Sequence, residues 1–152
     1  MAAEEVFDQL LEVSLLLEAD LSRSMAELGL TVTRTHLLWE VQLNGPSTQQ
    51  RLADALGVSP RHVTGLVDAL ESDGFARRLP HPQDRRAFLV TLTEKGTATM
   101  TTMQQQRRQA AGELVAGLDD PAVEQLQHGL DVVLTRLRQL VADAQGDPRS
   151  AG

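Results

Sequence analysis

The fold of this chain depends on residues 47–74, STQQRLADALGVSPRHVTGLVDALESDG. The stretch reads as two short amphipathic helices separated by Gly57, because glycine readily adopts the left-handed backbone of a tight turn. Ser47 stands three residues before a glutamine, which is the spacing of a capping box and predicts the start of the first helix. Ser59 followed by Pro60 predicts the start of the second helix, since serine caps helix N-termini and proline at the first helical position loses no hydrogen bond.

Apolar residues at helical spacing hold these two predicted helices together. They are Leu52, Leu56, Val58, Val63 and Leu66, with the small Ala53 where the helices cross. Two short helices joined by a tight glycine-containing turn are typical of a helix-turn-helix, whose second helix enters the major groove of DNA. A helical hairpin with a purely structural role has the same pattern, so this segment alone leaves that alternative open.

The residues that follow change from helical periodicity to alternation. Residues 75–79 and 88–92 read as two strands of a hairpin, and the polar, proline-rich residues 80–86 between them read as a loop. That loop contains Arg85 and Arg86. A hairpin with an arginine-bearing loop directly after a recognition helix is typical of the wing of a winged helix.

Longer helices flank this segment. Apolar residues at spacings of three and four predict a helix over 4–28, ended by Gly29, and further helices over 33–43, 94–118 and from 120 to about 141. The predicted fold is therefore mainly α, with a small β wing and long helices at both ends. The end helices carry more apolar surface than one small lobe can bury, so we expect a two-fold homodimer to cover it.

The composition excludes several classes of function. The chain has 152 residues, about one domain in length, and contains no cysteine. Disulfides, thiolate metal sites and cysteine nucleophiles are thus excluded. The sequence has neither a glycine-rich phosphate loop nor a nucleophile elbow, so we do not expect an enzyme, and we expect no cofactor or metal.

The net charge of −7 is unevenly distributed along the chain. Residues 1–46 hold two basic and eight acidic residues, whereas residues 47–95 hold seven basic and six acidic residues. One surface of an acidic protein can therefore be basic. No stretch approaches the roughly 18 apolar residues of a membrane span, and the acidic N-terminus lacks the basic flank of a signal peptide. We expect a cytoplasmic protein with no membrane partner.

The wing segment resembles the MarR family, the multiple-antibiotic-resistance-type regulators. The matching residues are Gly74-Phe75, Arg78, Asp84-Arg85-Arg86, Val90-Thr91-Leu92-Thr93 and Gly96. The flanking helices occur in the order that the family has, so the resemblance extends over most of the chain. It implies a single MarR-like domain over residues 1–152, divided into a winged helix-turn-helix DNA-binding lobe at 32–94, a helical dimerisation lobe built from 1–31 and 95–145, and a disordered tail at 146–152.

The resemblance also implies a function. It predicts a homodimer that binds an inverted-repeat operator in double-stranded DNA sequence-specifically and represses transcription. A small-molecule effector, for which an aromatic compound is one candidate, releases the DNA by binding between the lobes. Folds do not fix function, so a winged-helix module that binds another protein without specific DNA binding is the alternative.

The same resemblance assigns DNA contacts to the two helix starts, the recognition helix and the wing. The expected contacts are Thr48, Gln49, Ser59, Arg61, His62, Thr64, Gly65, Arg85 and Arg86. Arg61 is the best candidate to contact the edge of a guanine, and Arg86 matches the arginine that the family inserts into the minor groove. The helix starts at Thr48 and Ser59 can donate backbone N–H groups to phosphate. Many relatives carry a long polar or basic residue where this chain has Gly65, which leaves fewer base contacts.

Four further residues have expected roles away from DNA. Arg78 is expected to hold the wing through a carboxylate, and Asp84 to orient the neighbouring arginines. His36 and Trp39 lie three apart on one predicted helix, and an aromatic wall with a polar tip suits a small aromatic ligand. A packing role in the core is the ordinary alternative for Trp39.

Overall fold

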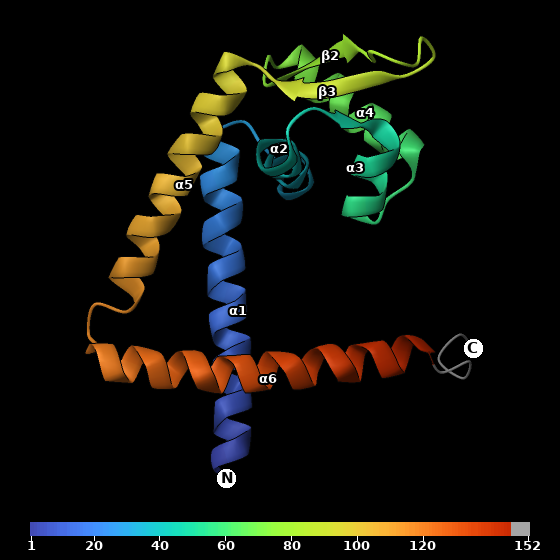
Figure 1. Ribbon diagram of the computed structural model, residues 1–152. Coiled ribbons are helices and arrows are strands. Elements are labelled where there is room, and N and C mark those ends of the chain that lie inside the picture. The colour runs from blue at the N-terminus through green and yellow to red at the C-terminus, as the bar shows by residue number, and fades with distance from the viewer. Residues whose placement is uncertain (147–152) are drawn as a thin grey trace. The chain divides into compact units, whose positions relative to one another are not determined.

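The computed structural model describes residues 1–146 and divides into two compact units, residues 1–104 and the residues from 105 onward. In chain order the elements are α1 (Ala2–Glu27), α2 (Val32–Asn44), β1 (Ser47–Thr48), α3 (Gln49–Leu56), α4 (Pro60–Ser72), β2 (Ala76–Pro80), β3 (Phe88–Leu92), α5 (Glu94–Leu114) and α6 (Asp120–Gly146) (Figure 1). The fold is mainly helical with a small antiparallel sheet, which confirms the predicted winged helix-turn-helix.

One aliphatic core holds α2, α3, α4, the sheet and the start of α5 together. Its largest fully buried side chains are Leu37, Leu38, Leu52, Val63, Val67, Leu70, Val90 and Met100. Burying each of these side chains stabilises the fold by about 1.5–3 kcal/mol relative to leaving it exposed. Three of them lie on one side of α4, so the core fixes how this helix is rotated and leaves its opposite side to solvent.

The start of α3 differs from the prediction. Ser47 is not the cap of this helix but is buried and pairs with Val90, in a third strand that makes the sheet order β1-β3-β2. Thr48 is the cap instead, and its hydroxyl accepts a hydrogen bond from the backbone N–H of Arg51 at 3.2 Å. Pairing with β3 commits the backbone of Ser47 to the sheet, so the helix begins one residue later than its capping-box spacing indicates.

The turn of the helix-turn-helix agrees with its prediction. Gly57 follows α3 with φ 67° and ψ 32°, the left-handed conformation. Ser59 caps α4 by accepting a hydrogen bond from the backbone N–H of His62 at 3.1 Å, and Pro60 is the first residue of the helix. The short connection therefore stops one helix and starts the next within a few residues.

The wing consists of β2, β3 and the loop between them. The two strands pair antiparallel, from Ala76 opposite Leu92 to Pro80 opposite Phe88. Both predicted strands are confirmed, with β2 starting one residue later than predicted. The loop at 81–87 extends beyond the paired strands (Figure 1).

The long helices leave much apolar surface uncovered. No residue of α1 is buried, and none is buried over residues 120–144 of α6. α5 ends at Leu114, before the predicted end at 118. Within residues 1–146, no helix is both long and apolar enough to cross a membrane. The predicted tail at 146–152 lies outside the described residues, apart from Gly146 at the end of α6.

Candidate nucleic-acid interface

The first two turns of α4 present one side to solvent. Val63 and Val67 of this helix have no exposed surface, so the core fixes which residues point outward. The residues that point outward are the cap residue Ser59 together with Arg61, His62, Thr64 and Gly65, and we call them the outer face of α4. Thr64 is half-buried and the other four are exposed. The structure thus brings five of the expected contact residues together on one surface.

Arg61 is free to reach a partner from this face. Among the residues that the structure describes, no carboxylate lies within ion-pair distance of its guanidinium group. The positive end of the α4 dipole lies at the same end of the helix and favours an anion there. The Ser59 hydroxyl, by contrast, already accepts the backbone N–H of His62.

Gln49 is placed differently from the other expected contacts. It is half-buried, and its side-chain amide donates hydrogen bonds to the backbone carbonyl of Pro60 and to the hydroxyl of Thr64. Its amide nitrogen is therefore turned toward α4, and it connects the first helix of the motif to the second.

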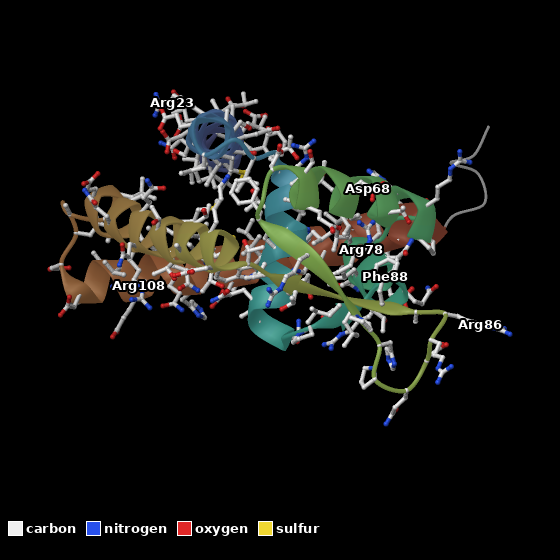
Figure 2. All side chains as sticks on the ribbon, turned by 90° about the horizontal axis from the view of Figure 1, so that it is seen from above. Arg23, Asp68, Arg78, Arg86, Phe88 and Arg108 are labelled. Atoms are coloured by element: carbon white, nitrogen blue, oxygen red, sulfur yellow. The ribbon has the colours of Figure 1, made fainter. Side chains whose placement is uncertain are left out.

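The wing loop is shaped by side chains that bind its own backbone. The Asp84 carboxylate accepts the backbone N–H of Arg86 at 2.9 Å. The Nδ1 atom of His81 accepts the backbone N–H groups of Gln83 and Asp84, each at 3.1 Å. Within the described chain, Asp84 makes no ion pair with either loop arginine. Arg85 and Arg86 are exposed, and neither forms an ion pair with any other described residue. Figure 2 shows the Arg86 side chain extending outward from the wing.

Arg78 connects the wing to the recognition helix. Its guanidinium group in β2 donates hydrogen bonds to Asp68 and Glu71 of α4 and lies over the Phe88 ring, with Cζ 4.9 Å from the ring centroid (Figure 2). Partial burial lowers the pKa of Arg78, but the hydrogen bonds and charges of the two carboxylates outweigh it, so the pKa is raised. The guanidinium group therefore stays charged, and its single positive charge offsets part of the negative charge of Asp68 and Glu71 on α4.

We expect Arg78→Ala to loosen the wing. The change removes two partly exposed ion pairs and one cation–π contact, which together are worth about 1–2 kcal/mol. The melting temperature should fall by about 2–8 °C in thermal unfolding. Arg77→Ala is the matched control, because Arg77 is exposed and forms no ion pair among the described residues. Equal melting temperatures for the two variants would contradict the role of Arg78.

The two expected ligand residues are not among those that line the groove found in this unit. His36 is exposed, while Trp39 is half-buried and packs against the core. A groove of about 360 Å³ lies elsewhere in the same unit, lined by Ser14, Leu17, Glu18, Leu21, Ser22, Met25 and Val32. In the described part of the chain, no three His, Asp or Glu side chains gather in a way that could hold a metal ion.

Comparisons with known proteins agree with this geometry. The model of the MarR family matches residues 30–88. The multiple antibiotic resistance protein MarR of Salmonella typhimurium is 30% identical over 115 residues, which are 75% of this chain and 80% of that protein. The transcriptional activatory protein BadR of Rhodopseudomonas palustris is 29% identical over 95% of this chain and 85% of its own length. The crystal structure of wild type MarR from E. coli, in its apo form, matches with a TM-score of 0.69 and 27% identity, over 84% of this chain and 94% of that one.

The matched segment contains α2, the helix-turn-helix and the wing loop, so the likeness includes the elements that carry the candidate interface. Proteins of this family are DNA-binding transcriptional regulators and not enzymes. The resemblance seen in the sequence is confirmed over most of the chain. This chain belongs to the MarR family of winged helix-turn-helix transcriptional regulators.

Proposed function

We propose that this chain is a homodimeric repressor that binds an inverted-repeat operator in double-stranded DNA and releases it when a small molecule binds. The observation that carries the proposal is the division of its arginines. Arg61, Arg85 and Arg86 are exposed and have no carboxylate partner in the described chain, whereas Arg34 and Arg78 are paired with acids of the same unit. Exposed arginines without an ion pair also occur on other described elements, such as Arg108 of α5, but these three lie on the two elements that reach DNA in a winged helix.

These arginines have different tasks at a duplex. Arg61, on the outer face of α4, suits bidentate hydrogen bonding to the O6 and N7 atoms of a guanine in the major groove. Arg86 suits the minor groove, where a narrow groove concentrates negative potential. Contacts to phosphates fix the register of the protein on the duplex. The groups suited to such contacts are Arg85, His62 and the helix starts at Thr48 and Ser59. In the proposed complex, base preference depends on α4 and overall affinity on the wing.

The exposed apolar residues of the long helices support a homodimer. In α1 they include Phe7, Leu11, Leu17 and Leu21, and in α6 Leu126, Leu130, Val133, Leu137 and Leu140. A helix with no buried side chain gains little stability from its own hydrogen bonds, so a partner must cover these residues. A second copy related by a two-fold axis is the partner we propose, because it also spaces two recognition helices about one DNA turn, roughly 34 Å, apart.

Repression follows from occupancy in this proposal. A dimer bound across two half-sites covers the duplex and blocks other proteins from it, in the cytoplasm where the DNA lies. A small aromatic effector would contact Trp39 and His36 and shift the dimer to a state that binds DNA poorly. One relative is named an activatory protein, so repression has to be distinguished from activation. A reporter gene behind the bound promoter does this, because deletion of this chain should raise expression of the reporter if the chain is a repressor.

We expect Arg86→Ala to weaken DNA binding about 5- to 100-fold with little change in base preference, because the arginine contacts the groove and backbone rather than a base edge. The slope of log affinity against log salt should become shallower by about one unit. Arg61→Ala should instead relax the preference for one base pair. Fluorescence anisotropy at two salt concentrations, with the promoter next to the chain's own gene and with duplexes that carry single base-pair changes, measures both effects.

Arg108→Ala is the charge-matched control, because it removes the same charge from α5, outside the helix-turn-helix and the wing. It should leave both the affinity and the salt slope close to those of the unchanged chain. Equal losses in Arg86→Ala and Arg108→Ala would contradict the role of the wing. Absence of binding to any duplex would overturn the DNA-binding function and favour a module that binds another protein.

A further inference from the structure

The amide of Gln49 has only one orientation that satisfies its partners. The Pro60 carbonyl oxygen can only accept a hydrogen bond, so the Gln49 Nε2 group, and not its oxygen, must face it. The same nitrogen donates to the Thr64 hydroxyl. Both N–H bonds of the amide are therefore used within the helix-turn-helix, and neither is left for DNA.

The hydroxyl of Thr64 is occupied as well. It donates a hydrogen bond to the Pro60 carbonyl oxygen at 3.2 Å and accepts one from Gln49. A hydroxyl has one donor hydrogen, so Thr64 has no donor left for a base or a phosphate. This half-buried side chain therefore has its methyl group and one acceptor lone pair of the hydroxyl left for a partner.

The neighbouring Gly65 has no side chain that would keep the backbone of α4 away from DNA. It is exposed inside α4, and a Cβ atom added to it would meet nothing within 4 Å. Glycine is less favourable than alanine within a helix, and no contact among the described residues requires it here. A short threonine side chain reaches a base only if the helix backbone comes close to the groove, and a residue without a side chain permits this.

We propose that Thr64 recognises a thymine in the major groove through its methyl group, and that Gln49 is a positioning residue that holds the Thr64 hydroxyl away from DNA. This inference rests on the proposed DNA-binding function. Thymine alone among the four bases presents a C5-methyl group in the major groove, and threonine methyls pack against it. Burying one methyl group corresponds to about a four-fold change in affinity.

The test begins with selection of bound sequences from randomised duplexes by the full chain. Each thymine of the enriched half-site is then replaced by deoxyuridine, which lacks only the methyl group. The unchanged protein should bind about four-fold more weakly when one particular thymine is replaced. Thr64→Ser, which keeps the hydroxyl, should bind the original duplex about four-fold more weakly and ignore the replacement. Thr64→Val, which keeps a methyl and removes the hydroxyl, should still respond to it.

Gln49→Ala separates positioning from contact. Freeing the Thr64 side chain should reduce the response to deoxyuridine at that thymine, while the salt dependence stays unchanged because no phosphate contact is lost. Adding Thr64→Ser to Gln49→Ala should remove the response that remains, because serine lacks the methyl group. Gln50→Ala is the matched control, since Gln50 is exposed and its amide donates to Asp54 at 2.9 Å within its own helix. Gly65→Ala should raise the melting temperature and yet weaken binding.

Several outcomes would overturn the inference, with thermal unfolding confirming that each variant is folded. In the first, deoxyuridine weakens binding at no position. In the second, Thr64→Ser still responds to deoxyuridine but Thr64→Val does not. In the third, the slope of log affinity against log salt is shallower for Gln49→Ala. The first two would show that the methyl group makes no base contact, and the third that Gln49 contacts phosphate itself. If no sequence is enriched at all, sequence-specific binding fails and the inference fails with it.

Discussion

Gly96→Ala is expected to destabilise the winged helix-turn-helix by at least about 3 kcal/mol, the upper range for forcing an extra carbon into a packed core. A Cβ atom at Gly96 would lie 2.0 Å from the carbonyl oxygen of Phe75 and 3.0 Å from its carbonyl carbon. Both atoms belong to backbone beside a side chain that is only 3% exposed, so neither can rotate away. The melting temperature should fall by about 6–12 °C in thermal unfolding.

The surrounding contacts explain why the backbone cannot shift to make room. The Phe75 carbonyl oxygen already accepts the backbone N–H of Thr93 at 3.1 Å. The Thr93 hydroxyl donates to the Gly74 carbonyl oxygen and accepts the backbone N–H of Gly96 at 3.0 Å. Lys95 adds a contact, with Nζ 4.4 Å from the centroid of the Phe75 ring. Moving α5 outward would break this junction between the start of the wing and the end of β3.

The same substitution farther along α5 supplies the control. A Cβ atom at Gly112 would meet nothing within 4 Å, so Gly112→Ala should stabilise the helix by about 0.5–1 kcal/mol. Opposite signs for two identical substitutions in one helix would isolate the close approach as the cause. A Gly96→Ala protein as stable as the unchanged chain would contradict this account.

The predicted features that hold in the structure depend on neighbouring residues. Gly57 determines the turn through its backbone conformation and Ser59 through its side-chain cap. The hydrogen-bond partners that both use lie only a few positions away in the chain. The inward positions Val63 and Val67 follow from helical periodicity, and they in turn decide which residues form the outer face of α4. Local chemistry of this kind is readable from one sequence.

The features that the sequence did not predict depend on residues far apart in the chain. Ser47 joins the sheet because β3 passes beside it, and no pattern near residue 47 reports that strand. The bond of the Gln49 amide to the Pro60 carbonyl oxygen was also not predicted, because it depends on the packing of α3 against α4. A carboxylate was expected for Arg78, yet its partners in α4 are known only once the wing is folded onto that helix. Long-range packing decides each of these contacts.

The largest effect on DNA binding is expected from charges placed on the apolar side of α6. Leu126, Leu130, Val133, Leu137 and Leu140 recur at alternating spacings of four and three, and all are 38–53% exposed. This repeat is typical of a seam along which two helices pack. Leu130→Glu with Leu137→Glu would bring charges into that seam, where unpaired carboxylates are strongly unfavourable. We expect the doubly substituted chain to be monomeric in analytical ultracentrifugation.

The operator proposed above has two half-sites, and a monomer has only one recognition helix and one wing to bind them. Losing simultaneous engagement of both half-sites should weaken operator binding by about 10²- to 10⁴-fold, although every residue of the outer face of α4 is unchanged. His128→Glu with Thr135→Glu is the matched control, because these positions have the same spacing, lie on the other side of the helix and gain the same charge. The control should remain dimeric and bind normally, and circular dichroism should show helical structure in both proteins. A dimeric Leu130→Glu, Leu137→Glu chain with undiminished affinity would exclude this seam as the contact between subunits, because two buried carboxylates per chain could not persist there unpaired.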